Sequence, residues 1–386
     1  MNESRRLLSV DAVRGTAMLF VGISHISEYV QQYSLTDADR LRWLGYFATP
    51  AFLLMSGIAS GYQLAGPAAR MAAIRILDRG LFVLLVGHML VSASLVYLVP
   101  RGTAYEHIVI TDSIGLMLCT TPFLRHLSIK QLMLSGGAIV FVSSIASVAW
   151  EPASSFTAIV GALLFDIKGP TIPDAGWITA TLPYLGIFVV GIGIGKVVKG
   201  NTIQERGRNL SWHLALAGAT LIFAGVALNA IAHFAKPLLA ADYPGSHWSH
   251  AFLAALDVRH KIPPGPAYVL FYGGLTVALV GVLGLLPERG HPLLMAPVRI
   301  AAVFGRASFV SYVVLQWLID FVPGWAGFGD RLSLGLAWGY LTLVMLVTFQ
   351  VARAWDARRA NRYLTLGLRR LMSDDIPPNA PRTLQI

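Results

Sequence analysis

Charged residues are scarce in this sequence. Asp, Glu, Lys and Arg together make up 13% of its 386 residues, whereas apolar residues make up 55%. A soluble domain carries roughly 25% charged residues. Because a chain of this length with so few charges lacks the polar surface that a soluble fold needs, the composition excludes an ordinary soluble enzyme.

Cysteine is almost absent. The single cysteine, Cys119, lies in an apolar stretch, so the chain forms no internal disulfide and no thiolate metal cluster. We interpret Cys119 as a small buried hydrophobic residue. The sequence also shows no zinc-type spacing of His, Cys and Asp, no Gly-x-Ser-x-Gly motif and no paired carboxylates within one span. Hydrolase and metalloenzyme functions therefore have little support, and no metal is predicted.

Long apolar stretches recur along the whole chain. Many reach about 20 residues, which is enough to cross the hydrocarbon core of a bilayer. They predict an all-α, polytopic membrane protein with about ten transmembrane helices. The predicted spans are residues 8–30, 43–65, 80–99, 107–124, 131–150, 177–198, 212–235, 265–287, 299–322 and 332–354. An apolar piece near residues 155–166 is too short to span and is expected to be re-entrant or interfacial.

Basic residues predict how the chain is oriented. The formal net charge is +10, but most charges lie in short loops, so they indicate contact with a lipid bilayer rather than with nucleic acid. With ten spans, 20 of the 30 lysines and arginines fall on the side of the two termini and 8 on the other. This asymmetry predicts that both termini are cytoplasmic. The short loops and the arginine-rich composition favour the cell (inner) membrane of a bacterium.

The domain organisation is predicted to be simple. We expect a single transmembrane domain over residues 1–372 and a disordered polar tail over residues 373–386. The basic start followed by an apolar run is similar to a secretion signal. However, Asp11 and Arg14 interrupt the run and no small-residue cleavage site follows, so a retained first helix is expected. The sequence leaves open whether the protein forms a homodimer.

Glycine pairs four residues apart occur in two spans, as Gly57 with Gly61 and Gly191 with Gly195. Such pairs let helices approach closely, which predicts packing contacts. The run from Gly191 to Lys196 is superficially similar to a phosphate-binding loop, but it lacks the four-residue gap and the following Ser or Thr. A nucleotide site in this run is therefore not expected.

The first predicted span carries ionisable residues on one face. Arg14 and His25 are eleven positions apart, close to three helical turns, which places them on nearly the same face and about 16 Å apart along the axis. Asp11 precedes Arg14 by three residues and Glu28 follows His25 by three, so each acid lies beside its basic neighbour. Ionisable residues inside a span are costly and indicate function. The alternative is structural: Arg14 reaches to the interface and His25 bonds a neighbouring helix.

Further polar residues lie in later spans. Asp112 follows His107 at the outer start of the fourth span, in the same half of the membrane as His25. We predict that Asp112 orients His25 or the acceptor substrate. The other polar residues are interpreted mainly as forming helix-to-helix hydrogen bonds. They are His88, Asn229, His233, Arg306, Gln316 and Asp320. Among them, His88 and Gln316 rank highest for a role in substrate binding.

The start of the chain resembles a known superfamily. The stretch Leu8-Ser-Val-Asp-Ala-Val-Arg-Gly, followed by an apolar run and His25, resembles the opening helix of the transmembrane acyltransferases. This superfamily includes acyltransferase family 3 and the heparan-α-glucosaminide N-acetyltransferase-like proteins. The spacing of Arg14 and His25 matches the basic residue, ten intervening residues and histidine of family 3.

Three later segments are also similar to this superfamily. The stretch from Phe47 to Gly57 resembles the Pro-x-Phe…Ser-Gly segment that follows the first helix. The basic stretch with Arg70, Arg75 and Arg79 resembles the arginine-bearing connection after it. The run from Lys261 to Tyr268 resembles a proline-rich helix entry of the N-acetyltransferase-like branch. The resemblance is clearest over the first 80 residues.

The resemblance implies an acyltransferase. Such an enzyme moves an acyl group, by default acetyl from acetyl-CoA, to a hydroxyl or amine of a sugar, a glycan or a secondary metabolite. The acceptor must lose a proton, and a histidine with a pKa near neutral suits that task. We therefore predict that His25 is the general base, assisted by Glu28 or Asp112.

A coenzyme A donor needs cationic partners, and arginine suits phosphate groups. We predict that Arg14, paired with Asp11, holds the donor within the membrane, and that Arg75 and Arg79, one helical turn apart, bind its nucleotide phosphates. For Arg75 and Arg79 the alternative is that they are ordinary cytoplasmic charges that set the topology.

Two other functions remain open. In the first, the protein is a transporter or flippase for a small molecule or a lipid-linked substrate, and Arg14, His25 and Asp112 line a polar pathway without chemistry. The absence of an internal repeat counts mildly against it. In the second, the protein is a non-catalytic membrane scaffold, which does not account for the shared face of Arg14 and His25.

Overall fold

The protein is helical, as predicted. The computed structural model describes residues 8–29, 43–98, 104–106, 108–150, 154–165, 181–200, 204–242, 247–261, 264–286, 291–327 and 332–368. Its α-helices are α1 (Leu8–Ile26), α3 (Ala48–Leu64), α4 (Ala69–Phe82), α5 (His88–Ser92), α6 (Ile110–Leu124), α7 (Ile129–Ala149), α8 (Ser155–Phe165), α9 (Thr181–Gly200), α10 (Gln204–Asp242), α11 (His247–Leu256), α12 (Pro266–Leu285), α13 (Pro292–Arg306), α14 (Ser308–Gln316), α15 (Val322–Ala326) and α16 (Leu334–Ala357). The predicted tail, residues 373–386, lies outside the described residues.

Two π-helices interrupt the α-helices. The first, η2 (Val83–Gly87), joins α4 to α5, and the second, η5 (Trp317–Phe321), joins α14 to α15. Short 3₁₀ turns include η1 (Ser27–Tyr29), η4 (Ala104–Glu106) and η6 (Ala360–Tyr363). A π-turn holds one more residue than an α-turn and often marks a functional site, so these two segments are relevant to the chemistry.

Eight helical segments among the described residues are long and apolar enough to cross a membrane. They are Trp43–Leu64, Ala69–Leu95, Ile129–Ser147, Thr181–Gly200, Arg208–Pro237, Pro266–Leu285, Ser308–Ala326 and Leu334–Ala357. The prediction of a polytopic, all-α membrane protein is thus confirmed. The helices α1 and α6, which correspond to the first and fourth predicted spans, are not among the eight, so the total of ten and the side on which the termini lie remain predictions.

The predicted span over residues 299–322 is wrong as one element. The helix α13 ends at Arg306, and α14 begins at Ser308. The break places Arg306 at a helix end, where its Nε donates to Asp356 at 2.7 Å and its carbonyl accepts from Asn361. Apolar content alone does not distinguish one straight span from two helices joined by a single residue, because both have the same composition.

The basic stretch that was expected to be a connection is helical. Arg70, Arg75 and Arg79 lie on α4, which continues through η2 and α5 as one apolar segment, Ala69–Leu95. The short piece near residues 155–166 is the helix α8, whose 11 residues extend about 16 Å and fall short of the hydrocarbon core.

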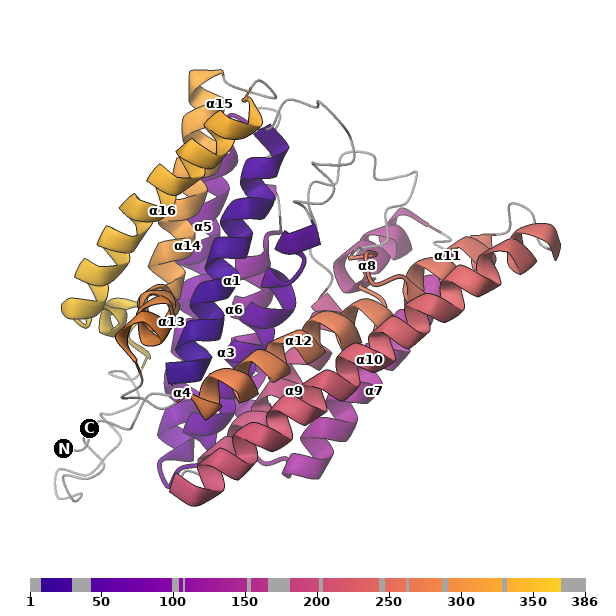
Figure 1. Ribbon diagram of the computed structural model, residues 1–386, viewed down its shortest axis with the longest axis horizontal. Coiled ribbons are helices and arrows are strands. Elements are labelled where there is room, and N and C mark those ends of the chain that lie inside the picture. The colour runs from indigo at the N-terminus through magenta and orange to yellow at the C-terminus, as the bar shows by residue number, and fades with distance from the viewer. Residues whose placement is uncertain are drawn as a thin grey trace.

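The helix α1 lies at the centre of one group of helices. It packs against α3, α12, α13, α14 and α16 (Figure 1). Its residues Val13, Ala17 and Met18 are fully buried. In Figure 1, α10 and α12 run side by side across the front, tilted relative to α1, and these two helices share an extensive contact. The polar face of α1 is therefore enclosed by other helices.

Glycines allow the closest helix crossings. A methyl group at Gly57 of α3 would lie 2.3 Å from the carbonyl oxygen of Phe188, and one at Gly191 of α9 would lie 2.6 Å from that of Leu54. The predicted packing role of these glycines is confirmed. The crossing of α1 and α13 is tighter still, since a methyl group at Gly15 would lie 1.7 Å from the Ala301 carbonyl oxygen.

Replacement of Gly15 with alanine is expected to destabilise the protein. The new methyl group would overlap the backbone of α13, which cannot rotate away as a side chain can, so a loss of about 1–3 kcal/mol or more is expected. Thermal unfolding in detergent measures the effect as a lower melting temperature. The matched control is Gly137→Ala on α7, where no atom lies within 4 Å of the added methyl group. Equal melting temperatures for the two variants would contradict the close crossing.

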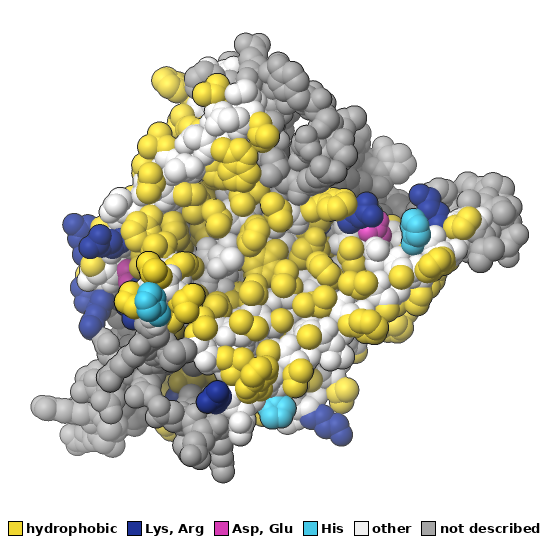
Figure 2. Space-filling view, viewed as in Figure 1, with side chains coloured by type: hydrophobic (Ala, Val, Ile, Leu, Met, Phe, Trp, Pro, Cys, Tyr) yellow, Lys and Arg dark blue, Asp and Glu magenta, His cyan; other side chains and the backbone are white. Residues whose placement is uncertain are grey.

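The outer surface is suited to lipid. Figure 2 shows that apolar side chains cover most of one face, whereas lysine and arginine side chains gather at its edges. On α10, Leu216, Phe223 and Phe234 are largely exposed. An apolar surface of this extent is unfavourable in water, so it supports a protein that lies within the bilayer.

Candidate functional site

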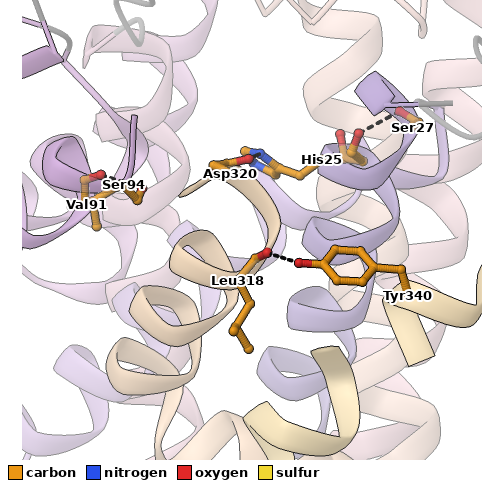
Figure 3. A network of polar contacts seen from close by, with 8 residues as sticks. His25, Ser27, Val91, Ser94, Leu318, Asp320 and Tyr340 are labelled. Carbon is orange, nitrogen blue, oxygen red and sulfur yellow. Dashed lines mark hydrogen bonds and ion pairs between the residues drawn. The ribbon is translucent and has the colours of Figure 1, made fainter. Parts of the chain in front are cut away.

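His25 faces a buried carboxylate. It occupies the end of α1, and its Nδ1 lies 3.4 Å from Oδ1 of Asp320 on η5. The Asp320 side chain is 1% exposed, whereas that of His25 is 21% exposed. In Figure 3 the two side chains point towards one another from α1 and η5. His25 is therefore partly accessible, whereas the carboxylate that it contacts is enclosed.

The π-helix η5 sets the position of Asp320. Within the described residues, neither carboxylate oxygen of Asp320 has a partner that meets hydrogen-bond geometry, and the same holds for Oε1 of Gln316 one turn earlier. The hydroxyl of Tyr340 donates to the carbonyl of Leu318 within the π-turn (Figure 3). A buried carboxylate without hydrogen bonds is costly, so Asp320 is a candidate for binding a charged or hydrogen-bonding group.

Asp112 pairs with a different histidine from the one expected. Its Oδ2 lies 3.0 Å from Nδ1 of His88 and also accepts from the backbone N–H of Val109 at 2.9 Å. The other ring nitrogen of His88 lies 3.0 Å from the carbonyl oxygen of Tyr105. Asp320, rather than Asp112, lies beside His25, and the role of Asp112 in orienting His25 or the acceptor stays a prediction.

Both histidine–carboxylate pairs depend on π-helices. His88 follows η2 directly, and Asp320 lies inside η5. A π-turn holds one more residue than an α-turn, so each segment places these side chains differently from an unbroken α-helix. The backbone of Glu28 lies in η1, but its side chain, like His107, lies outside the described part of the chain.

A cavity of about 570 Å³ lies among α1, α3, α4, α6 and α14. Its walls combine apolar side chains with four arginines and one aspartate. The charged lining residues are Arg14, Arg75, Asp78, Arg79 and Arg362. The structure thus brings together three of the four residues predicted to bind the donor. Asp11 does not line the cavity, but it interacts electrostatically with Arg14 on the same helix.

Arg14 lies in the cavity wall on α1. Its Nη2 donates to the carbonyl oxygen of Met55 at 3.0 Å, and its Nε is buried without a hydrogen-bond partner among the described residues. This carbonyl belongs to α3, which packs against α1. An arginine with an unused donor has capacity to bind an anionic or carbonyl group.

The cavity is elongated along the helices. Its wall on α3 extends from Phe52 to Gln63, a length of about 16 Å. Arg75 and Arg79 of α4 line the cavity, and so do Thr111 of α6 and Tyr312 of α14. Thr111 immediately precedes Asp112, and Tyr312 is close enough to interact electrostatically with both Asp112 and Asp320. Thr111 and Tyr312 therefore bring the wall of this arginine-lined cavity close to the two histidine–carboxylate pairs, whose four side chains do not themselves line it.

Two other polar residues have structural partners. Asn229 accepts a hydrogen bond from the backbone N–H of Val258 through its Oδ1 at 3.1 Å, and Arg306 pairs with Asp356 as described. Both were interpreted as helix-to-helix hydrogen bonds. This is confirmed for Arg306, which joins α13 to α16, whereas Asn229 bonds a turn that follows α11. Asp320 and Arg362 are the residues that sequence reasoning undervalued. The signal for Asp320 was its presence as an acid in an apolar span.

The fold and the site define a polytopic membrane protein whose interior holds an arginine-lined cavity and two histidine–carboxylate pairs. The family model described as heparan-alpha-glucosaminide N-acetyltransferase, catalytic domain, matches residues 6–231. This is more than half of the chain. The protein therefore belongs to this family, which implies a membrane acetyltransferase. No curated protein matches the chain. The match includes His25, Asp112 and the arginines of α4 but not Asp320; membership of acyltransferase family 3 remains a prediction.

Proposed function

We propose that the protein is an acyl-CoA-dependent acyltransferase that moves an acyl group, by default acetyl, to a hydroxyl or amine of a sugar, a glycan or a secondary metabolite. The observation that carries this proposal is the arginine-lined cavity whose wall comes close to the histidine–carboxylate pairs. A coenzyme A molecule combines phosphates, which arginine binds well, with a long arm that suits an elongated and partly apolar cavity.

The donor is proposed to enter the cavity beside its arginines, from the cytoplasm, and the protein to lie in the cell (inner) membrane. Arg75 and Arg79 bind the nucleotide phosphates, and Arg14 contacts the donor deeper in the membrane. The arm then carries the thioester towards His25, on the side from which the acceptor arrives. Positive charge at the cytoplasmic side agrees with the usual orientation of membrane proteins.

In the proposed reaction the acyl group moves from the sulfur of coenzyme A to the oxygen or nitrogen of the acceptor. His25 takes the proton from the acceptor hydroxyl or amine as that group attacks the thioester carbonyl. A C–O or C–N bond forms, the C–S bond breaks, and the leaving sulfur ends as the thiol of coenzyme A after it receives a proton. Asp320 holds the ring of His25 in position and stabilises the positive charge that the ring acquires, as a carboxylate does for a catalytic histidine.

Calorimetric binding of acetyl-CoA to the purified protein in detergent tests the donor site. We expect saturable binding by the native chain and a loss of about tenfold or more for Arg14→Ala, because a buried charge-assisted interaction is removed. Circular dichroism and a single size-exclusion peak show whether the variant is folded. Arg353→Ala on α16, an exposed arginine that does not line the cavity, is the control.

Absence of acetyl-CoA binding by the folded native protein would contradict the proposal. The transporter alternative then predicts movement of a substrate across vesicles without consumption of acyl-CoA. The family match gives no support to that alternative.

A further inference from the structure

The chain after α16 forms one wall of the cavity. Residues 359–367, here named the C-terminal strap, begin at Arg359 with a φ of 51° and end at Gly367 with a φ of 86°. Left-handed backbone at both ends turns the chain sharply, and η6 lies between these two turns. The strap residues that line the cavity are Asn361, Arg362, Leu364, Thr365 and Gly367.

Hydrogen bonds fasten the strap at both ends. Asn361 donates to the carbonyl oxygen of Arg306 at 2.6 Å and accepts from Nε1 of Trp355 at 2.9 Å. At the other end, the hydroxyl of Thr365 and the backbone N–H of Leu366 both donate to Asp78, the second at 2.8 Å. These contacts connect the strap to α13, α16 and α4.

Asp78 is the single acid among the residues that line the cavity. It is 3% exposed, and both of its carboxylate oxygens accept hydrogen bonds from the strap. Because its charge is directed at these donors, it opposes an incoming anion less than an unbonded carboxylate would. The bond to the strap therefore keeps the electrostatic character of the cavity positive.

Arg362 brings the fourth arginine to the cavity. Its Nη2 donates to the Tyr363 hydroxyl at 2.7 Å, and its guanidinium carbon lies over the Tyr363 ring, 4.8 Å from the ring centre. No ion pair involves Arg362 among the described residues. A guanidinium held by an aromatic ring and a hydroxyl keeps its full charge for an anionic ligand.

We propose that the C-terminal strap recognises the nucleotide phosphates of the coenzyme A donor, with Arg362 as the phosphate-binding residue and Asp78 as the anchor that holds the strap over the cavity. This inference rests on the proposed function. The strap lies outside residues 6–231, the part of the chain that matches the family model.

Binding of three probes by Arg362→Ala tests the inference. The probes are acetyl-CoA, adenosine 3′,5′-bisphosphate, which contains only the nucleotide end, and S-acetyl-pantetheine, which contains only the arm. We expect the variant to bind the first two about tenfold or more weakly than the native protein, because a charge-assisted bond to phosphate is lost. Binding of S-acetyl-pantetheine is expected to be unchanged.

A second variant separates the anchor from the cation. Thr365→Val removes one hydrogen bond to Asp78 and leaves every arginine in place, so it is expected to weaken binding of acetyl-CoA and of the bisphosphate by a smaller factor than Arg362→Ala. The exposed Arg353→Ala serves again as the control for loss of a positive charge.

The possible outcomes are distinct. If the native protein binds acetyl-CoA and Arg362→Ala binds it equally well, the strap inference is wrong and the donor site stands. If Arg362→Ala weakens all three probes equally, the strap has only a structural role. If added phosphatidylglycerol, rather than the bisphosphate, competes for the native site, the phosphate group recognised is that of a lipid. If the native protein binds none of the probes, the proposed function itself fails.

Discussion

Replacement of His25 with glutamine is expected to lower the rate of acyl transfer by about 10²–10⁴-fold, the usual contribution of a general base. Glutamine is polar and of similar size, so it preserves packing between α1 and η5, but its amide does not accept a proton at neutral pH. The measurement is thiol release from acetyl-CoA by the purified protein, with glucosamine as the probe acceptor. Acetyl-CoA affinity is expected to remain close to native, because His25 is separate from the arginines that are proposed to bind the donor.

The control for this variant is His213→Gln. His213 is exposed on α10 and bonds the backbone of its own helix at Asn209, so the rate is expected to be native. If His25→Gln binds acetyl-CoA normally and retains a rate within a fewfold of native, His25 is not the base. The pair of His88 and Asp112 would then be the next candidate for that role.

Replacement of Asp320 with asparagine is expected to reduce the rate by a comparable factor, about 10²–10⁴-fold, as loss of the carboxylate beside a catalytic histidine does elsewhere. The carboxylate lies 3.4 Å from Nδ1 of His25, so it favours a proton on that nitrogen and leaves the other nitrogen as the base. An asparagine amide that donates to Nδ1 favours the opposite tautomer. The thiol-release assay measures the loss, and acetyl-CoA binding shows whether the donor site is intact.

A double variant distinguishes this positioning role from a structural one. Residues that act as a unit in catalysis show strongly non-additive effects, so His25→Gln combined with Asp320→Asn is expected to be little worse than either variant alone. Independent multiplication of the two losses would show that Asp320 acts elsewhere. Asp257→Asn is the control, because Asp257 is 42% exposed and pairs with the exposed Arg259 at a distance of 3.8 Å.

The polar face of α1 could be predicted from the sequence, but the contact of its His25 with Asp320 could not. The spacing of Arg14 and His25 is a local property of one helix, so it was predictable from 3.6 residues per turn. The structure groups Arg14 with Arg75 and Arg79 around one cavity, and their role in donor binding stays a prediction. Asp320 was not assigned to His25, because nearly 300 residues separate them and no local pattern connects such distant positions.

Two further features were beyond sequence reasoning for physical reasons. A π-turn in an apolar helix differs from an α-turn by a single inserted residue, and the apolar pattern around Asp320 contains no mark of it. The strap was also missed, since Arg362 in a basic segment after the last span has the composition of an ordinary cytoplasmic charge. Its place in the cavity wall depends on Asp78, which lies on a different helix.

The close crossing at Gly15 fixes the position of α1 against α13. Backbone meets backbone there, since Gly305 of α13 also contacts the carbonyl group of Asp11, and no flexible side chain lies between the helices to let one slide along the other. Arg14 and His25 lie about 16 Å apart along this helix. Under the proposed function, a donor held at Arg14 therefore needs an arm of about that length to bring its acyl group to His25, and the length of the arm becomes a criterion for which thioesters react.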